Sequence, residues 1–164
     1  MKRLFILRHA KSSWDHPGLS DFERPLNDRG KKAAPFMGEL MLEKEFDPEI
    51  ILSSPAKRAK KTAKLVKENG LITGGIVFDE RIYGAGTNSL IHILAETGEE
   101  FSSAMIVGHN PGFEGLVEVL TRQYERMPTA ALAVIDLDIE KWSDIAAGCG
   151  KLVEILRPKE QGHF

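Results

Sequence analysis

The sequence lacks most features that mark secreted, membrane-spanning or metal-binding proteins. Its single cysteine, Cys149, excludes an internal disulfide and a cysteine-rich metal site, and it fits a reducing compartment. The first apolar run covers only residues 4–7 before Arg8 and His9 interrupt it, which is unlike a signal peptide. No apolar run approaches the length that crosses a bilayer. We therefore expect a cytoplasmic protein with no membrane contact.

A large excess of either charge is also absent. Lysine and arginine number 22 and aspartate and glutamate 24, so the formal net charge is −2, and we expect no nucleic-acid partner. The lysines within residues 57–67 fall mostly on the outside of a predicted helix and are interpreted as a solvated face. No glycine-rich loop ends in Lys-Ser or Lys-Thr, which excludes a nucleotide P-loop. His16, His92 and His163 lack metal-ligand spacing, so we expect neither a metal nor a cofactor.

Buried-looking apolar runs alternate with segments of helical spacing, which is typical of parallel strands joined by helices. We expect a single α/β domain over residues 1–164, built as a three-layer α/β/α sandwich around a mostly parallel sheet with an antiparallel edge. The predicted strands are residues 3–7, 50–55, 76–78, 104–108, 131–137 and 150–156. The predicted helices are residues 27–45, 56–69, 87–96 and 113–122, and Asn69-Gly70 predicts a left-handed cap for the second.

Arginine and histidine follow three of the predicted strands. Arg8 and His9 end the first strand, Arg58 follows the second after a short loop, and His109 ends the strand at residues 104–108. The carboxyl ends of parallel strands meet at one edge of a sheet, where open α/β folds usually carry their chemistry. The sequence therefore predicts a pocket that holds a phosphoryl group and attacks it with a histidine.

Four motifs in this order resemble the histidine phosphatase superfamily. They are Leu7-Arg8-His9, Pro25-Leu26-Asn27-Asp28-Arg29-Gly30, Ser53-Ser54-Pro55-Ala56-Lys57-Arg58-Ala59 and Val107-Gly108-His109-Asn110-Pro111. The match is closest to the small single-domain branch, the phosphohistidine phosphatases of the SixA type, and it implies a phosphoglycerate mutase-like fold. The family usually has glycine after its catalytic histidine, whereas this chain has Ala10, at which a positive φ is disfavoured.

The resemblance implies a role for each residue of the pocket. His9 resembles the nucleophile that takes the phosphoryl group and passes it to water. Arg8 and Arg58 would hold the phosphoryl oxygens through planar, permanently charged guanidinium groups. His109 would be a second histidine, protonated when phosphate is bound. Asn110 would donate to a phosphoryl oxygen, although formation of a turn before proline explains it equally well.

Three carboxylates of the sequence are candidates for a general acid that protonates the leaving group. Glu80 lies in a Glu-Arg-x-Tyr-Gly stretch that resembles the acid-bearing segment of the phosphoglycerate mutase branch. The alternative is a surface carboxylate paired with Arg81. An acid matters most for a phosphate ester, because a protonated imidazole already leaves readily. Asp15 and Asp21 are lesser candidates for the same role.

Three further residues near the predicted entrance have two interpretations each. Arg24 resembles an arginine that supports the pocket, or it forms a surface ion pair with Glu23 or Asp21. Trp14 and Tyr83 contact a protein substrate or cover the edge of the core, and we favour packing for both.

The expected function is that of a metal-independent phosphatase with a phosphohistidine intermediate on His9, acting on phosphohistidine of a carrier protein and releasing inorganic phosphate. Short connections between strands favour this substrate, because they leave an open pocket. The first alternative is a phosphatase of small phosphomonoesters with Glu80 as acid. The second belongs to another class, a binding module that docks phosphorylated partners without turnover.

Overall fold

The computed structural model describes residues 1–162, so His163 lies outside the described residues. The strands are β1 (Lys2–Arg8), β2 (Ile50–Ser53), β3 (Gly75–Phe78), β4 (Ser103–Gly108), β5 (Leu132–Leu137) and β6 (Gly150–Leu156). The helices are α1 (Asp28–Glu43), α2 (Lys57–Asn69), α3 (Thr87–Ala95), α4 (Gly112–Thr121) and α5 (Pro158–Gln161). Every predicted strand and helix is confirmed, with bounds that differ by a few residues. No helix among residues 1–162 is both long and apolar enough to span a bilayer.

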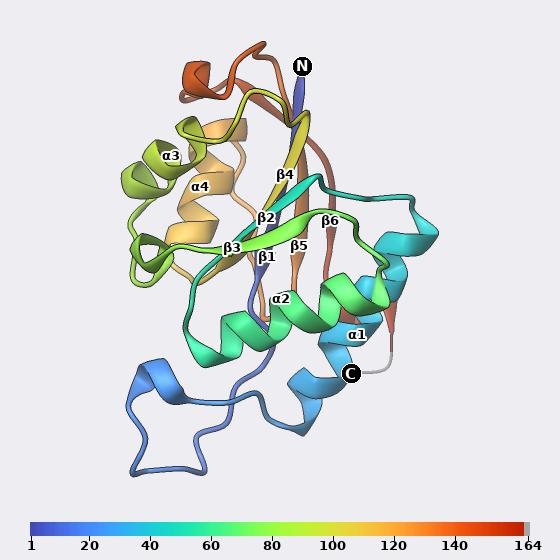
Figure 1. Ribbon diagram of the computed structural model, residues 1–164, viewed down its shortest axis with the longest axis vertical. Helices are drawn as coiled ribbons and strands as arrows, with labels where there is room; N and C mark the ends of the chain where they lie inside the picture. Colours follow the sequence, from blue (N-terminus) through green and yellow to red (C-terminus); the bar gives the residue numbers. More distant parts are fainter. Residues whose placement is uncertain (163–164) are drawn as a thin grey trace.

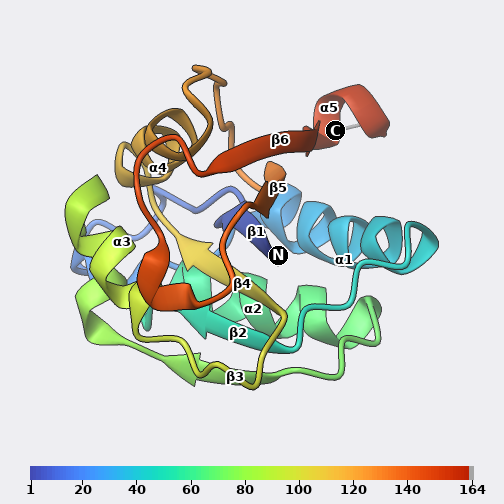
Figure 2. The same cartoon turned by 90° about the horizontal axis from the view of Figure 1, so that it is seen from above.

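The six strands form one mixed sheet in the order β3-β2-β4-β1-β5-β6. The pairs β3–β2, β2–β4 and β4–β1 are parallel, whereas β5 runs antiparallel to both β1 and β6. The predicted antiparallel edge is therefore confirmed. Helices α1 and α2 cover one face of this sheet and α3 and α4 cover the other, which makes the three layers visible in Figures 1 and 2.

Each face of the sheet has its own apolar core. Side chains alternate along β1, so Leu4 and Ile6 join the core under α3 and α4, while Phe5 and Leu7 join the core under α1 and α2. All four are at most 2% exposed. Because a central parallel strand is buried on both faces, it reads as an unbroken apolar run, and this explains why the sequence revealed β1 and β4 so clearly.

Helices α1 and α2 approach each other closely at two glycines. A Cβ atom at Gly38 would lie 2.7 Å from the Val66 carbonyl oxygen, and one at Gly70 would lie 2.9 Å from the Gly38 carbonyl oxygen. The predicted left-handed cap at Gly70 is wrong, because Gly70 has a φ of −89° and the positive φ of 50° falls on Leu71. Gly70 is thus required for space between two helices, not for its backbone conformation.

The carboxyl ends of β1, β2 and β4 meet at the lower edge of the sheet in Figure 1. The connection between β1 and α1 crosses this edge and extends below it as a long loop (Figure 1). It is joined back to itself by a bridge between Ser12 and Leu26. Helix α1 begins directly afterwards, where the Asn27 side chain caps the helix by accepting a hydrogen bond from the Gly30 amide.

Candidate active site

A cavity of about 230 Å³ opens at this edge of the sheet. Its walls contain five of the six predicted site residues, namely Arg8, His9, Arg58, His109 and Asn110. They come from the ends of β1 and β4 and from the first turn of α2. The parallel strands thus bring together residues that are up to about a hundred positions apart in the sequence.

His9 lies at the end of β1 with only 6% of its surface exposed. Its Nδ1 atom is 2.7 Å from the Ala10 carbonyl oxygen, which can only accept, so Nδ1 carries the proton and donates it. This bond leaves Nε2 as the nitrogen with a free electron pair. The sequence alone does not reveal which ring nitrogen of His9 is free to attack. Burial lowers the pKa of His9 to about 3, with further lowering by His109, Arg58 and Arg8, so the ring is neutral at neutral pH.

Ala10 occupies the place of the family's usual glycine without strain. Four non-glycine residues among those described have a positive φ, and Ala10 is not one of them. Its amide donates to the Thr62 hydroxyl at 2.9 Å, and that hydroxyl donates to the Arg58 carbonyl at 2.7 Å. Thr62 therefore ties the end of β1 to the first turns of α2. This role of Thr62 cannot be read from the sequence, because a threonine within a helix carries no signal of a distant partner.

His109 faces His9 across the cavity, with ring centroids 5.2 Å apart. Its Nε2 lies 2.8 Å from the Ser54 hydroxyl, and Tyr83 packs edge-on against the ring at 5.4 Å. Burial lowers the pKa of His109 to about 4, helped by the positive charge of Arg58. Its Nδ1 is buried and has no hydrogen-bond partner within the described residues.

The Arg8 guanidinium is held by the loop that precedes β5. Its Nη1 donates to the Met127 carbonyl at 3.0 Å, and the Met127 amide in turn donates to the Glu114 carboxylate at 2.7 Å. Burial is the main cause that lowers the pKa of Arg8, and the Glu114 charge opposes it. The Arg8 Nε is buried without a partner. Of the three buried side-chain atoms that lack a partner within residues 1–162, two therefore belong to residues of this cavity.

Arg58 is anchored by Asp21, from the loop between β1 and α1. Its two terminal nitrogens donate to the Asp21 backbone carbonyl at 2.6 Å and to the carboxylate at 3.0 Å. The same carboxylate accepts from the Tyr83 hydroxyl at 2.6 Å and from Arg24 at 2.9 Å. These bonds, with that of Tyr83 the largest, hold the pKa of Asp21 far below its usual range. An ionised Asp21 cannot serve as the general acid that the sequence left possible.

The Asn110 side chain forms hydrogen bonds with two backbone groups of the protein. Its amide nitrogen donates to the Met127 carbonyl at 2.9 Å, and its oxygen accepts from the Glu114 amide at 3.3 Å in the first turn of α4. The turn interpretation of this residue therefore fits the observed contacts, although Asn110 also lines the cavity.

The carboxylates predicted as acids lie outside the cavity lining. Glu80 is exposed in a short 3₁₀ helix after β3, and Asp15 is exposed in the loop after β1. The alternative for Glu80, an ion pair with Arg81, is wrong, because Arg81 pairs with Asp79 and Glu96. Within residues 1–162 no group of three or more His, Cys, Asp or Glu side chains is placed to hold a metal ion.

Arg24 pairs with Asp21, one of the two partners expected for it, but it is only 8% exposed and is not a surface residue. It lines the cavity and donates to the Ser13 carbonyl, which is compatible with a role in supporting the pocket. The packing role favoured for Trp14 is wrong, because the residue is 75% exposed and its ring lies over the Arg24 guanidinium at the cavity wall. Tyr83 is 36% exposed, and its ring packs edge-on against those of His109 and Phe22.

Comparisons with known proteins bear on this arrangement. A sequence profile of the histidine phosphatase superfamily (branch 1) matches residues 4–127. An uncharacterized protein of Mycobacterium tuberculosis (strain H37Rv) is 30% identical over 164 residues, which cover 93% of this chain and 100% of that protein. A crystal structure from Agrobacterium tumefaciens, provisionally named phosphohistidine phosphatase SixA, matches with a TM-score of 0.83 and 30% identity over 96% of this chain and 98% of its own. The protein histidine phosphatase SixA complexed with tungstate shows the same fold, with a TM-score of 0.82 and 24% identity over 97% of this chain and 99% of its own.

Proposed function

Because this chain belongs to branch 1 of the histidine phosphatase superfamily and is a phosphatase, we propose that it hydrolyses phosphohistidine on a carrier protein, without a metal ion, through a phosphohistidine intermediate on His9. The observation that carries the proposal is the His9 ring. It is neutral, its Nδ1–H is fixed on the Ala10 carbonyl, and its neighbours in the cavity are Arg8, Arg58 and His109. A nucleophile with one free nitrogen lies among donors suited to a phosphoryl group.

In the first step, His9 Nε2 attacks phosphorus and a new N–P bond forms. The bond from phosphorus to the substrate imidazole breaks, and its electron pair stays on the departing ring. If the other nitrogen of that ring carries a proton, the ring leaves as neutral imidazole and needs no acid. A reaction that needs no general acid agrees with the carboxylates of this region. Glu80 and Asp15 do not line the cavity, and Asp21 is ionised.

In the second step, water attacks phosphorus and the Nε2–P bond breaks. The electron pair returns to His9, and both protons of the water leave with the phosphate as H₂PO₄⁻. The charge on three phosphoryl oxygens is balanced by Arg8 and Arg58, which supply donors without reorganisation. A bound anion also raises the pKa of His109, because it offsets the burial and the Arg58 charge that lower it.

The buried Arg8 Nε and His109 Nδ1 support the assignment of the cavity to an oxyanion. A buried polar atom without a partner costs about 1–3 kcal/mol. Phosphoryl oxygens accept from an arginine Nε–H and from a histidinium N–H, so an oxyanion is a ligand that suits the unused donors of these two cavity residues.

Phosphate release tests the proposal directly. Purified protein with EDTA present is given a phosphohistidine-bearing protein or p-nitrophenyl phosphate, and each assay is repeated with His9→Ala and Arg58→Ala. We expect His9-dependent release that is fastest from the phosphohistidine protein, and a loss of at least about a hundredfold in Arg58→Ala, because charge stabilisation in the transition state is lost.

The other outcomes each reject a defined part of the proposal. Preference for the ester, with a further loss in Glu80→Gln, would indicate a phosphatase of small phosphomonoesters. Inhibition by EDTA would remove the metal-independent mechanism. No release from either substrate, with binding intact, would leave a module that docks phosphorylated partners.

A further inference from the structure

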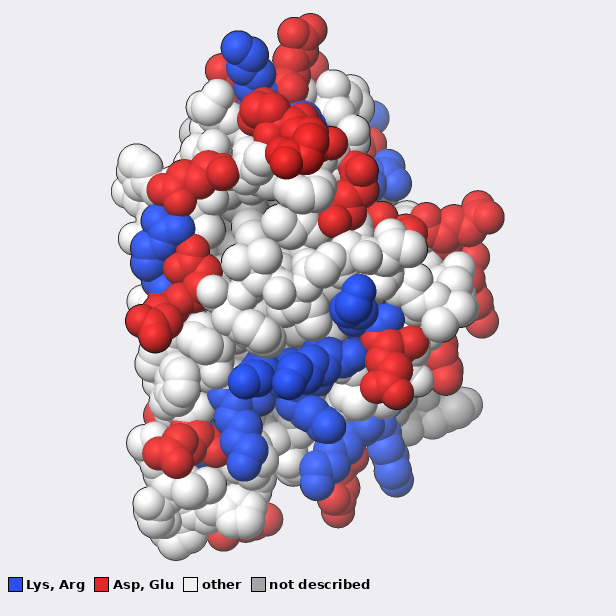
Figure 3. All heavy atoms as spheres, in the orientation of Figure 1, with Lys and Arg blue, Asp and Glu red and all other residues white. Residues whose placement is uncertain are grey.

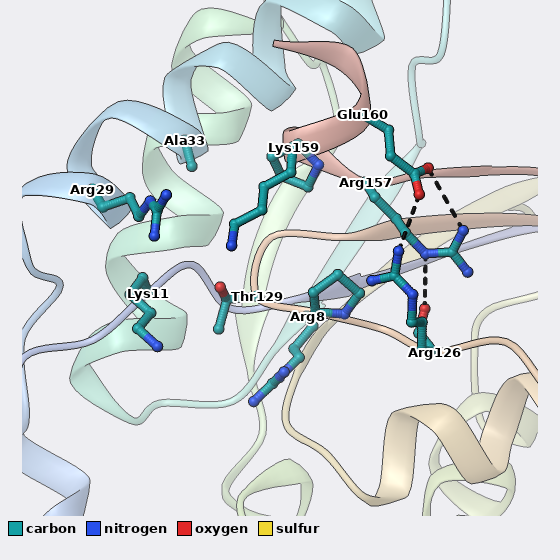
Figure 4. A pocket seen from close by; sticks show the side chains of 11 residues that line it. Arg8, Lys11, Arg29, Ala33, Arg126, Thr129, Arg157, Lys159 and Glu160 are labelled. Atoms are coloured by element: carbon teal, nitrogen blue, oxygen red, sulfur yellow. Dashed lines mark hydrogen bonds and ion pairs between the residues drawn. The ribbon is translucent and has the colours of Figure 1, made fainter. Parts of the chain in front are cut away.

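A second cavity, of about 330 Å³, adjoins the candidate active site. Arg8, Lys11 and Thr129 line both cavities, so the two open into neighbouring space. The second cavity lies between the beginning of α1, the loop before β5 and the short helix α5 (Figure 4). None of the functions derived above uses it.

The charges in this cavity are not balanced. On one side, Arg126 and Arg157 share the Glu160 carboxylate, and Arg157 also donates to Glu125 at 2.8 Å. On the other side, Lys11, Arg29 and Lys159 have no acidic partner among the described residues.

Figure 4 shows Arg29 and Lys159, from two separate segments, extending toward a common space beside the Thr129 hydroxyl, while Lys11 lines the same cavity and its side chain runs away from these two. Clustered like charges repel each other, and an incoming oxyanion would relieve this repulsion.

We propose that this cavity is a second anion subsite, formed by Lys11, Arg29 and Lys159, that takes an acidic side chain of the protein whose phosphohistidine enters the active site. The inference rests on the proposed function, since it names the surface chemistry of that substrate. Carboxylates suit the site, because the Arg29 guanidinium offers a fork of donors and Thr129 adds a hydroxyl.

Position is the reason to assign the subsite to the same partner. The two cavities share lining residues, so an acidic residue close to the phosphohistidine reaches the second cavity while the phosphoryl group occupies the first. The subsite then acts on recognition and on encounter rate, without touching the reacting atoms. The carrier protein is therefore expected to bear aspartate or glutamate near its phosphorylated histidine.

Two peptides test the proposal. Each carries one phosphohistidine, and they differ only in having glutamate or glutamine at the positions beside it. For the wild-type protein we expect kcat/KM to be about tenfold higher for the glutamate peptide. In the double variant Arg29→Ala/Lys159→Ala this preference should fall to about twofold or less. A preference that survives the double variant, or is absent in the wild type, would overturn the subsite.

A matched control separates a local site from general charge. Figure 3 shows a positive band on the face that α2 covers. Lys61 and Lys64 of α2 line a third cavity, which shares no lining residue with the other two. The variant Lys61→Ala/Lys64→Ala also removes two positive charges, but at another place, and it should keep the tenfold preference. An equal loss in this control would reduce the effect to net charge and reject the proposal.

Binding measurements distinguish failure of the subsite from failure of the proposed function. Calorimetric titration of the His9→Ala protein needs no turnover, and the glutamate peptide should bind about tenfold more tightly than the glutamine peptide until Arg29 and Lys159 are replaced. If that difference appears without turnover by the wild type, only the proposed function fails. Competition by tripolyphosphate that is tenfold stronger than by phosphate, with no preference between peptides, would assign the cavity to small polyphosphates and reject the protein partner.

Discussion

At the scale of single residues, the site depends on two histidines that stay neutral beside four cations. His9 and His109 share a cavity with Arg8, Lys11, Arg24 and Arg58, and burial is the largest cause that lowers the pKa of each ring. A protonated His9 has no free electron pair and cannot attack. The same burial that shields the nucleophile from solvent therefore also keeps it in its reactive form.

The lowered pKa of His9 predicts a loss of stability in mild acid. The unfolded chain binds a proton at His9 below pH 6.5, whereas the folded protein does so only near pH 3, so stability falls as the pH drops through this range. At pH 5 the loss from this histidine is about 2 kcal/mol at most. Urea unfolding of the wild type and of His9→Gln at pH 7.5 and pH 5.0 measures it, and an equal loss in both proteins would contradict the assignment.

Asp21 shows how one residue changes meaning between sequence and structure. The sequence offers it as a lesser candidate for the acid, one of several carboxylates near the motifs. In the structure, its backbone carbonyl and its carboxylate accept hydrogen bonds from the two terminal nitrogens of Arg58. Its carboxylate is thus a positioning group for Arg58, and the pattern of the sequence contains no sign of this contact.

At the scale of elements, the packing of α1 against α2 helps to position the site, because α2 carries Arg58 and Thr62. Thr62 on α2 ties this helix to the end of β1, and Arg58 reaches the cavity from its first turn. The two helices can lie this close only because residues 38 and 70 have no side chain. Glycine is usually unfavourable within a helix by about 1 kcal/mol, so Gly38 in the middle of α1 needs such a reason.

We predict that Gly38→Ala destabilises the protein by about 1–3 kcal/mol, although alanine is the better helix former. Its Cβ would lie 2.7 Å from the Val66 carbonyl oxygen and 3.0 Å from the Gly70 amide nitrogen, both of them backbone atoms. Thermal and urea unfolding measure the effect. Gly75→Ala is the control, because nothing lies within 4 Å of a Cβ at that position. A stabilised Gly38→Ala would show that the helices can separate at little cost.

At the scale of the whole molecule, two apolar cores share one sheet. Both cores draw residues from β1, β4 and β5, so neither persists when the sheet opens. We therefore predict one cooperative unfolding transition for residues 1–164, with coincident midpoints by near-UV and far-UV circular dichroism. Two separated transitions would indicate two folding units and contradict the single domain expected from the sequence.

The sequence alone determined the alternation of strands and helices, the two-faced central strands and the residues at the strand ends. These features are local or periodic, because burial on one or both faces of an element is written into consecutive positions. For the same reason the predicted helices at residues 27–45 and 87–96 agree with the structure to within two residues at each end.

Only the tertiary structure decided which side chains meet. Asp21 can anchor Arg58 only because the loop at residues 11–26 folds back over the site. The hydrogen bond from Ala10 to Thr62 needs α2 to pack beside the end of β1. The free nitrogen of His9 is set by the orientation of the Ala10 carbonyl. The three cations of the proposed subsite come from the loop after β1, from α1 and from α5, and Lys159 lies far along the chain from the other two. Such contacts have no period in the sequence, because they are set by how the elements pack and not by the pattern within any one of them.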